Sequence, residues 1–342
     1  YERGEIILVK KDWGMSESPW FEDLSVGDEF NNVPEVTITE GHLVAHQMAF
    51  GDRMALPLSW PLSQRVTKSP TPLVNSCLVA NMAIGLSTIP SQRVLGNLFY
   101  RGVAFKLPVF LGDTLKAKTS VVALRQNTIK PGRAASGMAV LNIEVSNQHN
   151  QTVLNFYRCP MLPCKDPEAK TGKNDDFDAI SHELQFDEIK ALVPNWDFDE
   201  FSPSQVPLRI GQRIVIEPRD TVTIAPEIVR LTLNLAMTHL DSRKGGYAQR
   251  LVYGGHTISL AAAQVSRSLP GLIAIICWFH CDHLAPVFEG DILRSEVLVN
   301  HRENYEQFSI LDLTVEVFAE SESVEKEERK VLDWRFGVVS KG

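Results

Sequence analysis

An internal repeat constrains this sequence more than any other feature, because two copies of one pattern are expected to fold into two copies of one architecture. The segment Pro-Val-Phe-Leu-Gly-Asp-Thr-Leu at residues 108–115 recurs as Pro-Val-Phe-Glu-Gly-Asp-Ile-Leu at residues 286–293, an offset of 178 residues. The same offset aligns two further pairs of segments: Leu73-Val74 with Leu251-Val252, and residues 153–156 with residues 331–334. Three matches in one register indicate a duplicated chain.

Each half combines one long apolar segment with several segments of alternating polarity. Residues 73–89 and 251–269 contain no Asp or Glu, and Arg267 is their only Lys or Arg. A helix that is apolar on nearly all sides must be buried, whereas alternation is typical of strands with one buried face. The sequence therefore predicts an α+β protein with two antiparallel sheets, each wrapped around a buried central helix. The alternating segments are residues 117–123, 139–145, 153–158, 294–300, 308–318 and 331–339.

A stretch rich in acidic residues separates the halves. Residues 165–200 contain eleven acidic side chains and four lysines, so their net charge is −7. We expect a surface linker there, with one short helix at residues 181–193. The first half also carries about eight extra residues between residues 52 and 72. The predicted boundaries are an N-terminal tail at 1–18, a first domain at 19–162, the linker at 163–203 and a second domain at 204–342.

Composition excludes several classes of function. The formal net charge is −8 and no basic run exists, which argues against nucleic acid and anionic membranes as partners. No apolar run approaches the roughly 20 residues of a membrane helix, and residues 1–10 lack a secretory signal pattern. Five scattered cysteines argue against a disulfide framework. We therefore expect a cytoplasmic protein whose body outside the linker is almost neutral.

Polar side chains gather in the second half, just before its apolar segment. Asn234 and His239 lie five residues apart, a spacing that suits a helix end turning into a loop with both side chains in one pocket. A neutral imidazole can accept and return a proton near pH 7. Asp241, two residues further on, is the second candidate partner for this imidazole. The alternative is a histidine that only packs and is hydrogen-bonded.

Gly254 and Gly255 stand where the chain enters the second apolar segment. Backbone N–H groups at a helix N-terminus can stabilise an oxyanion or an enolate. The alternative is a tight turn that simply needs glycine. Both interpretations can hold together.

Thiols and imidazoles also lie close together in the segment Cys277-Trp278-Phe279-His280-Cys281-Asp282-His283, as in zinc sites. The repeat places this segment in a single strand, whose alternate residues point to opposite faces. Four tetrahedral ligands do not come easily from one such strand, so we expect no metal site. The acid-rich residues 320–330 are expected to form a solvated hairpin loop without a catalytic role.

These residues resemble the active site of the MaoC-like hydratase family, whose members have hotdog folds and hydrate or dehydrate acyl thioesters. The family pattern is Asp-x-Asn-Pro-x-His, then a Val-His-Gly turn into the central helix, then Pro-Val-x-x-Gly-Asp. Here Asn234 replaces the aspartate, His239 is kept, and Tyr253 replaces the turn histidine. In the first half Asp52 begins the motif, but Pro57 stands at the histidine position. The resemblance implies a double hotdog protein with a catalytic second half and an inactive first half.

The resemblance also implies a reaction, namely the reversible addition of water to a short enoyl-CoA thioester. CoA is then part of the substrate, and no separate cofactor is expected. His239 would act as the base, assisted by Asn234 or Asp241. The residues expected to bind the substrate are those of the turn into the helix: Tyr253, Gly254, Gly255 and His256.

A carboxylate on the acyl group would require a cation, because arginine binds carboxylates through parallel hydrogen bonds. Two other functions stay open: a thioesterase, which in hotdog proteins commonly uses a carboxylate near the central helix, and a protein that only binds acyl thioesters. A homodimer is optional, since the duplication already supplies two hotdogs in one chain. The candidates for the cation that would bind such a carboxylate are the arginines nearest to the motifs: Arg243, Arg250, Arg65 and Arg101.

Overall fold

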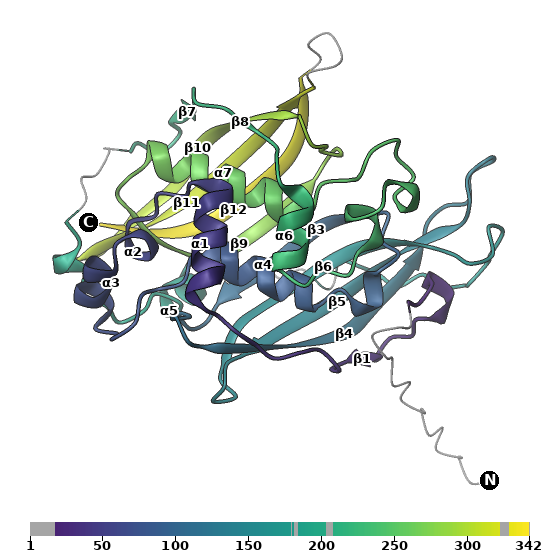
Figure 1. The fold of residues 1–342 in the computed structure, drawn as a ribbon, viewed down its shortest axis with the longest axis horizontal. Helices are drawn as coiled ribbons and strands as arrows, with labels where there is room; N and C mark the ends of the chain where they lie inside the picture. The colour runs from purple at the N-terminus through teal and green to yellow at the C-terminus, as the bar shows by residue number, and fades with distance from the viewer. Residues whose placement is uncertain (1–17, 179, 181–183, 203–207, 322–327, 342) are drawn as a thin grey trace.

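The computed structural model describes residues 18–178, 180, 184–202, 208–321 and 328–341 (Figure 1). Strands of these residues form one 12-stranded antiparallel sheet in the order β1-β4-β5-β6-β3-β9-β12-β11-β10-β7, with β2 beside β4 and β8 beside β10. Corresponding strands of the two halves occupy symmetric places in this order, so the duplication is confirmed. The first half contributes β1 (Glu29–Phe30), β2 (Val36–Thr37), β3 (Gly96–Phe105), β4 (Thr114–Gln126), β5 (Ser136–Ser146) and β6 (Thr152–Pro163). The second half contributes β7 (Arg213–Val215), β8 (Asp220–Thr221), β9 (Leu272–His283), β10 (Ile292–Asn304), β11 (Phe308–Glu320) and β12 (Arg329–Lys341).

The sheets of the two halves are continuous through β3 and β9. Tyr100 of β3 lies opposite Cys281 of β9 in an antiparallel register. An unpaired strand edge would expose a row of N–H and C=O groups. The duplication allows these two edges to satisfy each other, so the two predicted sheets join into one.

The predicted central helices are α4 (Ser76–Leu86) and α7 (Gly254–Ser268), and most of their side chains are buried. They contact each other directly, since Asn81 Nδ2 donates a hydrogen bond of 2.9 Å to Ser259 Oγ. These two residues are 178 positions apart, so the helices meet at equivalent points of the repeat. Gly85 allows the backbone of α4 to approach Thr232 of the second half, because a Cβ at position 85 would lie 1.8 Å from the Thr232 carbonyl oxygen.

The additional residues of the first half form helices on the outside of the sheet. The segment between residues 52 and 72 contains α2 (Ala55–Leu58) and α3 (Trp60–Thr67), as Figure 1 shows. No helix in the described part of the chain is long and apolar enough to cross a membrane. The remaining helices and turns are η1 (Phe21–Asp23), α1 (Glu40–Phe50), η2 (Ile89–Ser91), α5 (Phe186–Ala191), η3 (Phe198–Glu200), α6 (Ala225–Leu231), η4 (Met237–His239) and η5 (Ser242–Lys244).

The acidic segment between the halves is not a solvated linker throughout, and in this respect the prediction was wrong. The α-helix in its described residues, α5, lies within the predicted range, but Ile189, Trp196 and Phe201 around it are buried. They pack in one apolar cluster with Ile273 and Phe279 of β9. Because β9 lies near the middle of the sheet and is apolar on both faces, the face that points away from the central helices also has to be shielded from water by other residues. Residues 179, 181–183 and 203 of this segment, and residues 1–17 of the predicted tail, lie outside the described residues.

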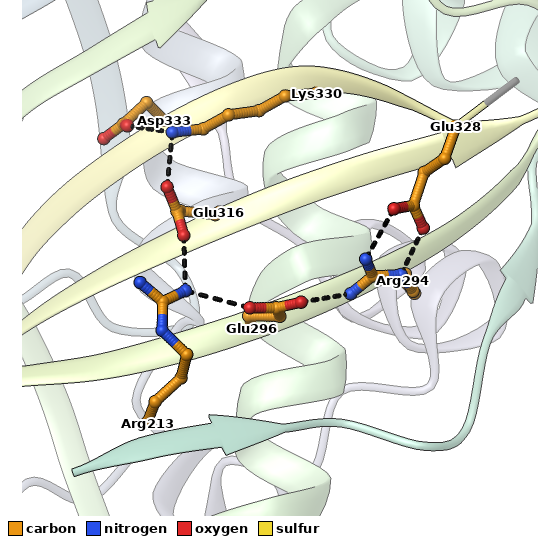
Figure 2. Close-up of polar contacts among 7 residues, drawn as sticks. All are labelled: Arg213, Arg294, Glu296, Glu316, Glu328, Lys330 and Asp333. Carbon is orange, nitrogen blue, oxygen red and sulfur yellow. Dashed lines mark hydrogen bonds and ion pairs between the residues drawn. The ribbon is translucent and has the colours of Figure 1, made fainter.

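The outer face of the second half carries a network of ion pairs, shown in Figure 2. Arg213 of the edge strand β7 donates to Glu296 of β10 at 2.9 Å and to Glu316 of β11 at 2.6 Å. Exposed pairs of this kind contribute at most about 1 kcal/mol each, so the network mainly holds the short strand β7 in register. Its members are Arg213, Arg294, Glu296, Glu316, Glu328, Lys330 and Asp333. Residues 322–327 of the predicted acidic loop lie outside the described residues.

Candidate active site

A cavity of about 210 Å³ lies between the two halves and contains the predicted histidine. Both halves line it, so neither half forms this site alone. The polar residues that the second half contributes are Asn234, His239, Tyr247, Tyr253, Thr257 and His283. Those that the first half contributes are Thr88, Ser91, Asn97, Tyr100 and Arg158.

His239 ends the short turn η4, and its ring is held in one orientation. Its Nδ1 lies 2.8 Å from the Leu251 carbonyl oxygen, which can only accept a hydrogen bond. Nδ1 must therefore carry the proton, and Nε2 carries the lone pair in the neutral ring. Burial lowers the pKa of His239 to about 4, although the bond to Leu251 opposes this shift. The residue is thus a neutral imidazole with a free basic nitrogen at physiological pH.

Asn234 reaches the same cavity through a strained turn. Leu233, directly before it, has a φ of 54°, a left-handed conformation that costs a branched residue roughly 1–2 kcal/mol. The Asn234 side-chain oxygen accepts a hydrogen bond of 2.9 Å from Ala236 N, which leaves the amide NH₂ as its remaining polar group. Because the Leu251 carbonyl already sets the tautomer of His239, the amide is not needed for that purpose.

The first half holds the segment that carries Asn234 and His239 in place. Leu235 N donates a hydrogen bond of 2.9 Å to Thr88 Oγ1, and Met237 N donates one of 2.8 Å to Gln92 O. Thr88 and Gln92 follow helix α4 of the first half. The position of His239 therefore depends on packing between the halves.

Only part of the predicted turn lines the cavity. Tyr253 and Gly254 do so, whereas Gly255 and His256 do not. Gly255 packs against α4, where a Cβ would lie 2.0 Å from Asn81 Oδ1. The His256 ring instead makes an edge contact with Phe50 of α1. Gly254 thus lines the cavity, whereas Gly255 allows the two central helices to touch, a purpose that the sequence did not predict.

The N-terminus of α7 has no side-chain cap. Among the described residues, the N–H groups of Gly254 and Gly255 have no hydrogen-bond acceptor. A Cβ at Gly254 would lie 2.5 Å from His283 Cε1, so glycine is required for the approach of this ring. The arrangement leaves a backbone donor at the cavity wall beside His239.

Sequence reasoning missed His283 as a cavity residue. It ends β9 and contacts Tyr100, with ring centroids 5.7 Å apart. Burial, together with the nearby His239, lowers its pKa to about 4. One sequence feature could have indicated this role. The first half has Phe105, and not a histidine, at the position equivalent to His283, so His283 is specific to the second half.

The thiols and imidazoles of β9 are not gathered at one point. Cys277 packs in the apolar cluster on one face of the sheet, and Cys281 packs in the cluster on the other. Within the described ranges, no three His, Cys, Asp or Glu side chains are grouped so that they could hold a metal ion.

Asp241 and the four predicted arginines lie outside the cavity lining, which corrects the sequence-based expectation. Asp241 is bound by the neighbouring Arg243 at 2.9 Å, and this contact lowers the pKa of the carboxyl to about 2. The other three arginines are also paired with carboxylates and so are not free to bind a further one. The pairs are Arg250 with Glu289, Arg65 with Glu200 and Arg101 with Asp282.

The first half has a cavity of its own, of about 380 Å³, at the position that corresponds to the motif. Asp52 and Pro57 line it, as the repeat predicts, and His46 of α1 also reaches it. Both titratable side chains are buried, so that the pKa of Asp52 is raised and that of His46 is lowered to about 3. Asp52 Oδ1 accepts a hydrogen bond of 2.7 Å from Met54 N. The imidazole from α1 was not expected from the sequence.

Comparisons with known proteins identify relatives of this chain, although no family model matches it. The β-methylmalyl-CoA dehydratase of Chloroflexus aurantiacus is 30% identical over 295 residues, which is 82% of either protein. The mesaconyl-CoA hydratase of Cereibacter sphaeroides is 27% identical over 290 residues, covering 82% of this chain and 83% of that protein.

Two solved structures share the fold. A conserved hypothetical protein of Mycobacterium tuberculosis, described as having a double hotdog fold, is 41% identical with a TM-score of 0.86, covering 95% of this chain and 99% of that one. A MaoC domain protein dehydratase of Chloroflexus aurantiacus has a TM-score of 0.79 at 23% identity, covering 95% of this chain and 97% of that one. The double hotdog fold expected from the sequence motifs is confirmed.

Proposed function

This chain belongs to the MaoC-like hydratases with a double hotdog fold, and we infer from this membership that it is a hydro-lyase acting on enoyl-CoA thioesters. The observation that carries the assignment within the site is His239, a neutral imidazole that lines the cavity and whose Nε2 has no hydrogen-bond partner among the described residues. A thioesterase using a carboxylate is disfavoured, because the residues lining this cavity include no Asp or Glu.

In the proposed reaction His239 acts as both base and acid. Its Nε2 takes a proton from a water molecule, and the oxygen of that water forms a bond to Cβ of the enoyl group. The π electrons move towards the thioester oxygen, and the imidazolium then returns its proton to Cα. Since burial lowers the pKa of His239 to about 4, the imidazolium is a strong acid and gives up this proton readily.

The charge that develops on the thioester oxygen needs a donor that is already oriented. The Gly254 N–H at the uncapped start of α7 is placed for this role, with the partial positive charge of the helix N-terminus behind it. The amide NH₂ of Asn234 holds the attacking water, since its oxygen is occupied by Ala236 N. CoA enters as part of the substrate, and no step requires a further cofactor.

We propose mesaconyl-CoA as the substrate, hydrated reversibly to β-methylmalyl-CoA. The 30% and 27% identical relatives, which bear the names of these two activities, support the choice. A cavity of about 210 Å³ suits a short acyl group better than a long one.

A spectrophotometric assay tests this proposal by following the loss of the enoyl-CoA absorbance. Mesaconyl-CoA and crotonyl-CoA are compared side by side, and we expect the larger kcat/KM for mesaconyl-CoA. A preference for crotonyl-CoA would contradict the substrate but leave the hydratase in place. Binding of CoA esters without turnover of either substrate would instead favour a protein that only binds acyl thioesters.

A further inference from the structure

Arg158 is a buried arginine of the first half that lines the cavity of the second half. It lies on β6, the strand that the alternating pattern predicts at this point, and its exposed fraction is only 3%. Taking a guanidinium out of water costs several kcal/mol unless charged or polar partners compensate. The environment of this side chain therefore has to explain its burial.

The hydrogen bonds that Arg158 makes satisfy only one end of the guanidinium. Nη2 donates to Ser87 O at 2.6 Å and to Ser91 Oγ at 2.7 Å. Ser87 is the C-terminal cap residue of α4, where the helix dipole places roughly half a negative charge. Nε has no hydrogen-bond partner within the described structure. Among the described residues the guanidinium is thus paired at Nη2 and unpaired at Nε.

No carboxylate is among the groups that influence Arg158. The titratable groups near it are Tyr100, Tyr253 and Cys159. Burial raises the pKa of both phenols and raises that of the thiol to about 12, so all three are neutral at pH 7. Burial also lowers the pKa of Arg158, but a guanidinium stays protonated in proteins at neutral pH.

The surroundings of Arg158 connect it with the reacting end of the cavity. Tyr253 contacts the His239 ring, with centroids 5.7 Å apart, and Tyr100 contacts the His283 ring at the same centroid distance. An anion beside Arg158 would therefore lie within the acyl pocket. The phosphates of CoA are multiply charged and bulky, and we expect them to stay outside a cavity of about 210 Å³.

We propose that Arg158 binds a carboxylate at the far end of the acyl group, so that this site is built for dicarboxylic enoyl-CoA thioesters. The proposal rests on the hydratase function proposed above and names the feature that selects its substrate. A buried guanidinium and a carboxylate form strong charge-assisted hydrogen bonds. The duplication then has a functional consequence, because the half without the catalytic histidine supplies the specificity residue.

Two substrates that differ only in the carboxylate provide the test. Mesaconyl-CoA carries a carboxylate on Cβ, and 2-methylcrotonyl-CoA carries a methyl group there. For the unmodified protein we expect kcat/KM to be about 10²-fold or more larger for mesaconyl-CoA. Arg158→Met should remove this preference by raising KM for mesaconyl-CoA, while kcat/KM for 2-methylcrotonyl-CoA changes by less than about threefold. Arg158→Lys keeps the charge and should restore part of the preference.

Arg101→Met is the matched control, because Arg101 lies on the neighbouring strand β3 and is paired with Asp282 outside the cavity lining. This variant should keep the ratio of the two kcat/KM values. An equal loss of both activities in Arg158→Met, with an unchanged circular dichroism spectrum, would show that Arg158 only caps α4 and would overturn the proposal.

A binding measurement on the unmodified protein covers the case in which Arg158→Met does not fold. Succinyl-CoA and butyryl-CoA are saturated and cannot be hydrated, and the first should bind at least about tenfold more tightly in calorimetry. Equal affinities would overturn the carboxylate site even if the hydratase function holds. Failure of the unmodified protein to hydrate any enoyl-CoA would refute the hydratase function itself, whatever the calorimetry shows.

Discussion

The N-termini of the two central helices differ, although the repeat places them at equivalent positions. Helix α4 begins after Asn75, whose side chain accepts a hydrogen bond of 2.8 Å from Cys77 N. Helix α7 begins after Tyr253, which provides no side-chain cap, and Gly254 and Gly255 follow. The first half uses a backbone donor to stabilise the helix, whereas the second half leaves the N–H of Gly254 at the wall of a cavity.

This difference shows how one fold position can serve either stability or chemistry. A side-chain cap contributes about 1 kcal/mol to a helix, but it also occupies the N–H groups that a substrate oxygen would need. The cavities of the two halves also differ, namely in the environment of their histidine side chains. The tautomer of His239 is fixed by the bond between its Nδ1 and the Leu251 carbonyl, whereas burial lowers the pKa of His46 in the first half to about 3. We expect the second half to carry out the proton transfer.

Removal of the catalytic imidazole should have the largest effect. His239→Ala is expected to lower kcat by about 10²–10⁴-fold, because it removes the group proposed to take the proton of the attacking water. His46→Ala, the variant in the other half, should keep kcat within about twofold. Activity lost in His46→Ala but kept in His239→Ala would reverse the assignment of the two halves. His283→Gln, measured alongside, tells whether the second imidazole of the cavity is the base instead.

A methyl group at the helix N-terminus should have the next largest effect. Gly254→Ala places a Cβ 2.5 Å from His283 Cε1, so the turn or the ring has to move. A shift of this size at a donor is expected to lower kcat/KM by about 10²-fold. The matched control is Gly41→Ala in the first turn of α1, where the nearest atom lies at an ordinary 3.6 Å. Equal activities of the two variants would contradict the requirement for glycine at position 254.

Loss of the cap in the first half should affect stability and not chemistry. Asn75→Ala is expected to lower the free energy of unfolding by about 1 kcal/mol, measured by urea denaturation. Asn75→Ser retains a capping oxygen and should recover most of this loss. The value of kcat/KM should stay unchanged in both variants. A selective loss of activity in Asn75→Ala would mean that the first half takes part in the reaction through this helix end.

The smallest expected effect is that of moderate acid on activity. Since the pKa of His239 is lowered to about 4, about nine tenths of its rings are still neutral at pH 5. The value of kcat/KM should therefore fall by less than twofold between pH 7 and pH 5, and the acid limb should appear near pH 4. An acid limb near pH 6.5, with a folded protein by circular dichroism, would show that His239 is not desolvated in solution.

Much of the fold and part of the site could be predicted from local patterns. Both central helices and six long strands were expected, because their periodicity and apolar runs are properties of neighbouring residues. His239, Asn234 and Gly254 were expected for the same reason, since one short stretch before the helix places them together. The prediction that Asp241 assists His239 was wrong, because Arg243 binds the Asp241 carboxylate outside the cavity lining. Only the course of the backbone decides whether such a side chain faces the cavity.

The sequence by itself determined a duplicated α+β chain, the half that keeps the imidazole and the glycine turn into α7. Only the tertiary structure decided that His283 and Arg158 line the same cavity as that imidazole, because the two halves meet through the pairing of β3 with β9 and the contact of α4 with α7. Spacing along a chain reports which residues share a helix face or a strand. It carries no record of the partner across a sheet, and that partner sets the burial, charge and proton affinity of the site.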